Sequence, residues 1–101
     1  IQFLLADMKT KIEASRLLTW KSAVDGDAGL RNTESAAHAK RFASDTAMEV
    51  TTDAVQVYGG YGYSEEYPVA RLMRGAKVMQ IYEGSSQVQR MIIGREITKD
   101  L

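Results

Sequence analysis

The chain has 101 residues, of which 45% are apolar, and this size favours one domain with a single packed core. Thirteen Lys and Arg residues balance thirteen Asp and Glu residues, so we expect no attraction to nucleic acid or to an anionic membrane. The sequence has no cysteine and one histidine, which excludes disulfides, thiolate chemistry and multi-histidine metal sites.

The first expected element is a helix over roughly residues 2–24. Apolar side chains recur at spacings of three and four from Leu4 to Leu18, and most charged residues lie outside this stripe. Gly26 and Gly29 then provide the flexible backbone that a helix end and a turn require. Because Ile1 opens this periodic segment with no capping residue before it, we expect the chain to be a piece of a longer protein.

A second helix is expected from Asn32 or Thr33, both good N-caps, to Tyr58. Small apolar residues recur along it every three or four positions, namely Ala36, Ala39, Ala43, Ala47, Val50, Ala54 and Val57. A stripe so rich in alanine allows close approach of another helix, so this segment is predicted to be the central packing helix.

Two further helices complete the pattern. Pro68 suits the first turn of a short helix from Val69 to about Lys77. A last helix is expected from about Gln87 to Thr98, preceded by Ser86 and Gln89 at capping-box spacing. The sequence therefore predicts an all-α antiparallel helical bundle of three long helices and one short one, with breaks near residues 26–32, 59–67 and 78–85. No apolar run approaches the roughly 18 residues of a membrane span, and no signal peptide is expected, so a soluble protein is predicted.

Three patterns look like known sites but lack part of the full motif. Residues 25–27 resemble the start of a calcium loop without its glycine and closing glutamate, so no metal ligand is predicted. Residues 60–62 lack the third glycine of a dinucleotide-binding fingerprint. Ser85 and Ser86 have only His38 as a possible activating base, which argues against a serine hydrolase. His38 itself is expected to be a helix-surface residue.

Two glycine-bearing segments could carry chemistry. Residues 56–63 contain three glycines and three tyrosines at a helix end, which suits either a ligand that approaches the backbone or an ordinary helix stop with an aromatic surface. Residues 80–90 place a lone carboxylate, Glu83, between an apolar stretch and a helix N-terminus. Such a carboxylate suits a general base, although these residues by themselves favour a simple position at the start of a helix.

In their order and spacing, these segments resemble the C-terminal helical domain of acyl-CoA dehydrogenases. The likeness is carried by residues 56–63, 66–68, 71–74 and 81–84, and it extends upstream to residues 5–8 and 14–18. It covers essentially the whole chain. It implies that residues 1–101 form this α-helical domain, without the N-terminal helical and β domains. Ser85 stands where threonine is usual in the family, and Gly75 stands where aspartate is common.

The resemblance implies a site for FAD-dependent α,β-dehydrogenation of an acyl-CoA to the trans-2-enoyl-CoA. Glu83 matches the base that removes the α-proton, and Tyr82 and Gly84 match substrate-binding positions. Because its base would stand at this position, the chain is most similar to the short-chain (butyryl) or short/branched-chain members of the family. The implied cofactor-binding residues are Gln56, Val57, Tyr58, Gly59, Gly60, Ser85 and Gln87, of which the first five would touch the FAD of a neighbouring subunit.

The resemblance also implies partners and a setting in fatty-acid β-oxidation. It implies a homo-oligomer (a dimer or tetramer), electron-transferring flavoprotein as electron acceptor, and a bacterial cytoplasm or a mitochondrial matrix. The isolated 101-residue chain is expected to be inactive. The alternative is a non-catalytic helical oligomerisation or interaction module with the same fold, but the carboxylate of Glu83 favours the enzyme.

Overall fold

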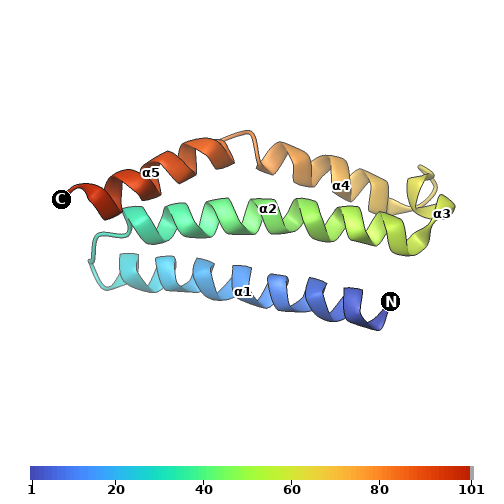
Figure 1. Cartoon of the computed structure of the whole chain (residues 1–101), viewed down its shortest axis with the longest axis horizontal. Coiled ribbons are helices and arrows are strands. Elements are labelled where there is room, and N and C mark those ends of the chain that lie inside the picture. The colour runs from blue at the N-terminus through green and yellow to red at the C-terminus, as the bar shows by residue number, and fades with distance from the viewer. Residues whose placement is uncertain (101) are drawn as a thin grey trace.

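The computed structural model describes residues 1–100, and all regular structure within them is helical. The elements are α1 (Gln2–Asp27), α2 (Thr33–Tyr58), α3 (Gly60–Tyr63), α4 (Pro68–Met79) and α5 (Ser86–Thr98). In Figure 1, α2 lies between α1 on one side and α4 and α5, placed end to end, on the other. The domain is elongated, with extents of 51 × 25 × 24 Å. The prediction of an all-α antiparallel bundle is confirmed.

The central helix is α2, as predicted, because it contacts each of the other four helices. Within residues 1–100, α1 packs against α2 alone. The buried residues of α2 are small: Ala37, Ala39, Ser44 and Thr46. The predicted alanine stripe is therefore only partly correct, since Ala39 is buried whereas Ala36 is exposed. Helices pack on two sides of α2, so its contacts are spread over two faces instead of one stripe.

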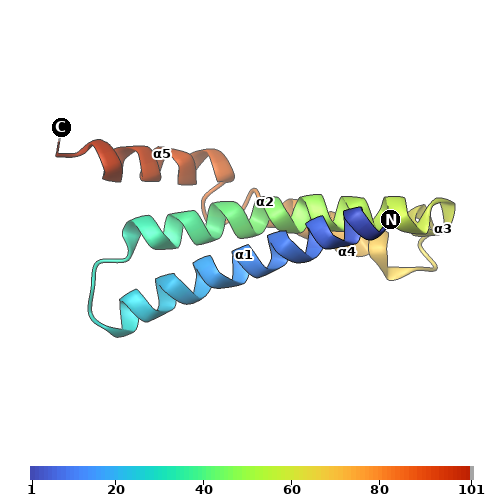
Figure 2. The same cartoon turned by 60° about the horizontal axis from the view of Figure 1, so that its bottom comes forward.

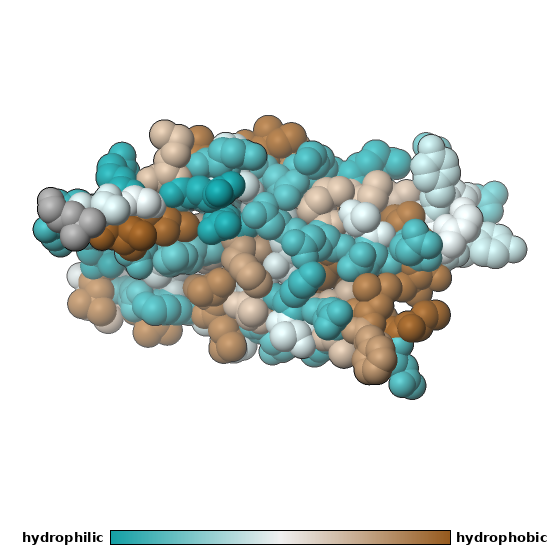
Figure 3. Space-filling model, viewed as in Figure 1, coloured by the Kyte–Doolittle hydropathy of each residue, from teal (hydrophilic) through white to brown (hydrophobic). Residues whose placement is uncertain are grey.

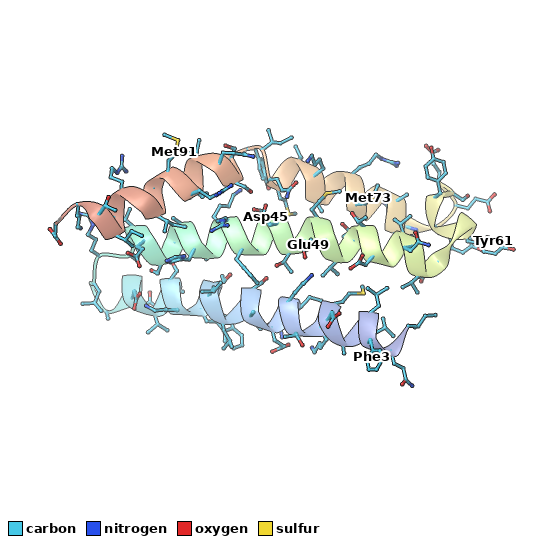
Figure 4. The ribbon with its side chains drawn as sticks, in the orientation of Figure 1. Phe3, Asp45, Glu49, Tyr61, Met73 and Met91 are labelled. Atoms are coloured by element: carbon cyan, nitrogen blue, oxygen red, sulfur yellow. The ribbon has the colours of Figure 1, made fainter. Side chains whose placement is uncertain are left out.

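The core is built from small side chains. Its buried apolar residues are Ala37, Ala39, Val69, Ala70 and Ala76, and no large side chain among the described residues is fully buried. Helix α1 has no buried residue at all, and Phe3 on it is 89% exposed. Figure 3 shows the resulting apolar surface as brown side chains on α1, and Figure 4 shows Phe3 pointing away from α2.

Polar contacts supplement this thin core between α1 and α2. The Nζ of Lys11 donates a hydrogen bond of 2.5 Å to Oε2 of Glu49, which raises the pKa of Lys11 above its ordinary value. Near the turn that joins α1 to α2, Nδ2 of Asn32 donates a hydrogen bond of 3.2 Å to the carbonyl oxygen of Ser22. Asn32 is the N-cap of α2, but its side chain does not cap that helix; it ties the turn back to α1.

Several element boundaries differ from the sequence prediction. Helix α1 continues through Gly26 to Asp27, because Gly29, with φ of +75°, makes the left-handed turn. The expected break at 59–67 contains one helical turn, α3, so the chain has five helices within residues 1–100. Only α1 and α2 are long, with 26 residues each, while α5 has 13.

The start of α5 is shifted by one residue from the prediction. Ser85, not Ser86, is the N-cap, and its Oγ accepts a hydrogen bond of 3.3 Å from the N–H of Val88. The predicted capping box of Ser86 and Gln89 is wrong, because both side chains bond elsewhere. Pro68 does occupy the first turn of α4, as predicted. None of the helices within residues 1–100 is long and apolar enough to span a membrane.

Candidate functional site

The segment between α4 and α5, residues 80–85, carries the candidate base and is called the 80–85 loop below. Glu83 has φ of 57°, and it is the only residue other than glycine with a positive φ in the described part of the chain. Gly84 follows with φ of +94°. A left-handed conformation costs an ordinary residue roughly 1–2 kcal/mol, so it persists only where the surroundings hold it.

Asp45 of α2 holds both ends of this loop. Its Oδ1 accepts a hydrogen bond of 2.8 Å from Nε2 of Gln80 and one of 2.7 Å from Oγ of Ser86. The backbone N–H of Ser86 also donates to the carbonyl oxygen of Gln80 over 3.1 Å. Figure 4 shows Asp45 on α2 beside the junction of α4 and α5. One carboxylate oxygen thus fixes the first residue of the loop and the first residue of α5.

Lys40, also on α2, contacts both the backbone and the Tyr82 ring of this segment. Its Nζ donates to the carbonyl oxygen of Met79 at 2.5 Å and to that of Gly84 at 3.4 Å. The same nitrogen lies 5.8 Å from the centre of the Tyr82 ring, within the range of a cation–π contact. Sequence reasoning did not single out Lys40 or Asp45, because neither belongs to a motif and both stand in an otherwise ordinary helical pattern.

Gly84 is restricted by packing as well as by its backbone. Nε2 of Gln89 donates a hydrogen bond of 3.3 Å to the Gly84 carbonyl oxygen, and a Cβ on Gly84 would lie 2.5 Å from that nitrogen. A side chain at this position would therefore collide with Gln89 and would also strain the backbone. The glycine therefore makes room for the Gln89 side chain directly behind Glu83.

The Glu83 carboxylate faces outward. Its side chain is exposed and makes no hydrogen bond or ion pair with any residue from 1 to 100. Its backbone N–H likewise donates no hydrogen bond within that range. A free carboxylate and a free N–H thus stand at the same residue. This combination can accept a proton and donate a hydrogen bond to one ligand.

An apolar groove of about 580 Å³ lies beside this loop. Small side chains of α1 and α2 form most of its wall, and Met79 and Tyr82 contribute from the α4 side. The sequence-predicted substrate residue Tyr82 therefore touches a space of apolar character, although half of its surface is exposed.

The predicted cofactor residues form two separate groups. Ser85 ends the 80–85 loop and Gln87 follows it on α5, whereas residues 56–60 lie at the far end of α2, next to α3 (Figure 2). Tyr58 is thirteen residues beyond Asp45, which corresponds to about 20 Å along the helix axis. The structure thus does not bring the two groups together within one chain.

Residues 56–60 present an open surface. Gln56, Tyr58, Gly59 and Gly60 are exposed, and Val57 is half-buried. A Cβ placed on either glycine would meet no atom within 4 Å, so the backbone is accessible from outside. Gly59 has φ of 65° and ψ of −137°, a conformation that glycine alone adopts readily, and it ends α2. The segment fits contact with a large ligand that is held by another body.

The clearest electrostatic shifts lie away from the loop. Hydrogen bonds from Lys99 and then from Arg31 hold the pKa of Glu96 below its ordinary value, and a hydrogen bond from Lys21 does the same for Asp25. The Lys21–Asp25 and Lys99–Glu96 pairs are local contacts along one helix, and the Arg31–Glu96 pair joins the turn before α2 to α5, so all three are structural contacts. Within residues 1–100 no group of three His, Asp or Glu residues could hold a metal ion. His38 lies on the helix surface, 3.4 Å from Glu34, as expected.

Comparison with known proteins agrees with this geometry. Residues 1–98 match the family model of the acyl-CoA dehydrogenase C-terminal domain. The short-chain-specific acyl-CoA dehydrogenase of Megasphaera elsdenii is 62% identical over 94 residues, which cover 93% of this chain and 24% of that protein. The structure of butyryl-CoA dehydrogenase from the same organism superposes with a TM-score of 0.93 at 59% identity, over 95% of this chain and 25% of that one.

A further solved chain belongs to a structure described as the electron transferring flavoprotein of Acidaminococcus fermentans. It superposes with a TM-score of 0.96 at 56% identity, over 98% of this chain and 26% of that one. The chain spans about a quarter of the length of the relatives it matches. It belongs to the acyl-CoA dehydrogenase family of flavoproteins, and it corresponds to the C-terminal helical domain of that family. The resemblance inferred from the sequence is confirmed.

Proposed function

We propose that this domain supplies the catalytic base and part of the flavin-binding surface of an FAD-dependent acyl-CoA dehydrogenase. The observation that carries the proposal is the exposed carboxylate of Glu83, held at a left-handed residue directly after Tyr82, which lines an apolar groove. A family member without dehydrogenation chemistry would have no need of a carboxylate there. The proposed substrate is a short-chain acyl-CoA thioester, and the product is the trans-2-enoyl-CoA.

In the proposed reaction, the Glu83 carboxylate accepts the α-proton of the thioester. The electron pair of that C–H bond forms the α,β double bond, and the β-hydrogen departs with its own electron pair. FAD, when bound, supplies the acceptor for this hydride. Because an α-C–H is a weak acid, charge that develops on the thioester oxygen must be stabilised, and the free N–H of Glu83 is a suitable donor.

Substrate binding is assigned to the residues that flank the base. Tyr82 borders the apolar groove and would line the pocket for the acyl chain, while Gly84, the residue after the base, is the second proposed substrate contact. A short-chain substrate is favoured because the relatives with high identity include proteins named short-chain-specific and butyryl-CoA dehydrogenases.

The two groups of cofactor residues support an assembly of several copies. Ser85 and Gln87 would contact the FAD that serves Glu83 of the same chain. Gln56, Val57, Tyr58, Gly59 and Gly60 are about 20 Å away along α2, so they would contact the FAD of a neighbouring subunit. This arrangement supports a homo-oligomer, as a dimer or tetramer. Electron-transferring flavoprotein is the proposed electron acceptor, and the bacterial cytoplasm is the proposed location because the similar proteins named above are bacterial.

The decisive experiment is Glu83→Gln in the complete dehydrogenase that carries this domain. The amide keeps the volume of the side chain but cannot accept the proton. FAD and acyl-CoA should still bind, while the rate of flavin reduction in stopped flow should fall by about 10²- to 10⁴-fold or more. Glu65→Gln, which neutralises an exposed glutamate outside the 80–85 loop, is the matched control. A Glu83→Gln rate within tenfold of wild type removes Glu83 from the catalytic role.

A non-catalytic interaction module is the second candidate, because α1 has no buried residue and exposes large apolar side chains. The 101-residue chain alone is proposed to be inactive in either case, since the proposed FAD site also needs residues of other domains and of a second subunit to orient FAD and acyl-CoA. Titration of FAD into this chain should show weak binding or none. A stable yellow complex would contradict the proposed location of the cofactor between subunits and domains.

A further inference from the structure

Asp45 connects parts of the chain that are distant in sequence. Its hydrogen-bond partners Gln80 and Ser86 lie 35 and 41 residues away, at the two ends of the 80–85 loop. Both donors meet the same oxygen, Oδ1, at 2.8 and 2.7 Å. Hydrogen bonds to an ionised acceptor are stronger than those between neutral groups. The α2 helix therefore adds a side-chain connection between the end of α4 and the start of α5, beside the backbone hydrogen bond from the Ser86 N–H to the Gln80 carbonyl oxygen.

The loop between these ends holds an unfavourable backbone conformation. Glu83, at φ of 57°, would relax toward an ordinary conformation if the loop ends could move apart. Lys40 also donates hydrogen bonds to the carbonyl oxygens of Met79 and Gly84. These bonds do not involve the side chains of Gln80 and Ser86. Asp45 is the residue whose side chain joins the two loop ends directly.

From this arrangement we infer that Asp45 is a positioning residue for Glu83: by closing the 80–85 loop it keeps the carboxylate and N–H of Glu83 in the orientation needed for proton removal. The inference rests on the proposed function of Glu83 as the base. Asp45 itself touches neither substrate nor cofactor in this role. Its removal should lower the rate of the chemical step and leave substrate affinity nearly unchanged.

The test compares four variants in the complete holoenzyme. Asp45→Ala removes both hydrogen bonds, whereas Asp45→Asn keeps an Oδ1 acceptor. Ser86→Ala removes one bond without touching α2, and it remains informative if Asp45→Ala does not fold. Asp53→Ala is the matched control, because Asp53 lies eight residues further along α2 and has no hydrogen bond to the loop within residues 1–100.

Two readouts separate positioning from a general structural effect. The first is flavin reduction at saturating butyryl-CoA, together with the Kd of butyryl-CoA. Asp45→Ala should reduce the rate about 10- to 100-fold, as small misplacements of a catalytic group do, with little change in Kd. Asp45→Asn should retain most of the wild-type rate of flavin reduction. The second readout is hydrogen exchange of peptides covering residues 80–86. This exchange should accelerate in Asp45→Ala and Ser86→Ala but not in Asp45→Asn or Asp53→Ala.

The outcomes distinguish this inference from the proposed function. If Glu83→Gln abolishes flavin reduction but Asp45→Ala and Ser86→Ala react at the wild-type rate, the positioning role is overturned and the base remains. Unchanged hydrogen exchange at residues 80–86 in both variants also overturns it. If Glu83→Gln reacts normally, the assignment of the base has failed, whatever the Asp45 variants do.

Discussion

Arg31 and Glu96 are 65 residues apart in the sequence, yet Nη2 of Arg31 lies 2.7 Å from Oε1 of Glu96. This ion pair joins the turn between α1 and α2 to the end of α5. Lys99 contacts the other carboxylate oxygen at 2.9 Å, and the Glu96 side chain is only 7% exposed. Because α5 buries only Ser86 and Gln89, both near its start, the pair is a main attachment of its C-terminal half.

The Glu96 contacts predict a pH dependence of stability. Hydrogen bonds from Lys99 and then Arg31 lower the pKa of Glu96, so its ionised form stabilises the fold above the unfolded pKa of about 4.3. That contribution is lost as the pH falls through the lower, folded pKa. Glu96→Gln should therefore lower the melting temperature at pH 7, and its difference from wild type should shrink from about pH 5 to about pH 3. Thermal melts with Glu65→Gln as control test this; a constant difference across that range would contradict it.

Gly62 is expected to be intolerant of a side chain. It is buried in α3, and a Cβ there would overlap the carbonyl oxygen of Val55 and approach Cβ of Tyr58 to 2.8 Å. Gly62→Ala should therefore destabilise the domain by about 1–3 kcal/mol, measured by chemical denaturation. Gly60→Ala is the control, because a Cβ at Gly60 meets no atom within 4 Å. Equal effects of the two substitutions would refute the packing explanation.

Gly75 offers the opposite case. It is an exposed residue inside α4, and a Cβ there would meet nothing within 4 Å. Gly75→Ala should stabilise the domain by about 0.5–1 kcal/mol, since alanine restricts the unfolded chain and favours helix. Gly29→Ala should be destabilising instead, because Gly29 has φ of +75°. Urea denaturation of both variants provides the measurement, and a loss of stability in Gly75→Ala would count against the prediction.

The exposed apolar face of α1 predicts self-association of the 101-residue chain. Phe3 is 89% exposed and Trp20 is 59% exposed on a helix with no buried residue. Sedimentation equilibrium should give a mass above the 11.2 kDa of one chain. Phe3→Lys should weaken the association, whereas Gln2→Lys adds the same charge next to it and should have less effect. A single species of monomer mass at high concentration would contradict the prediction.

Local sequence determined much of the fold. The three- and four-residue spacing of apolar side chains identified α1 and α2, because helix formation depends on neighbours within one or two turns. Pro68 marked the start of α4, and the glycines at 59 and 60 marked the end of α2. The segments around Gly59 and Glu83 were also sufficient to indicate the family, because their residues stand at a characteristic order and spacing.

Tertiary structure alone decided which distant residues meet. Nothing in the spacing of Asp45 indicates that its carboxylate binds Gln80 and Ser86, and nothing around Asn32 indicates that its side chain bonds to α1 rather than capping α2. The placement of Ser85 as N-cap likewise depended on Asp45, which engages the hydroxyl of Ser86. These contacts depend on how the other helices pack against α2, because each joins residues whose separation in sequence is unrelated to helical periodicity.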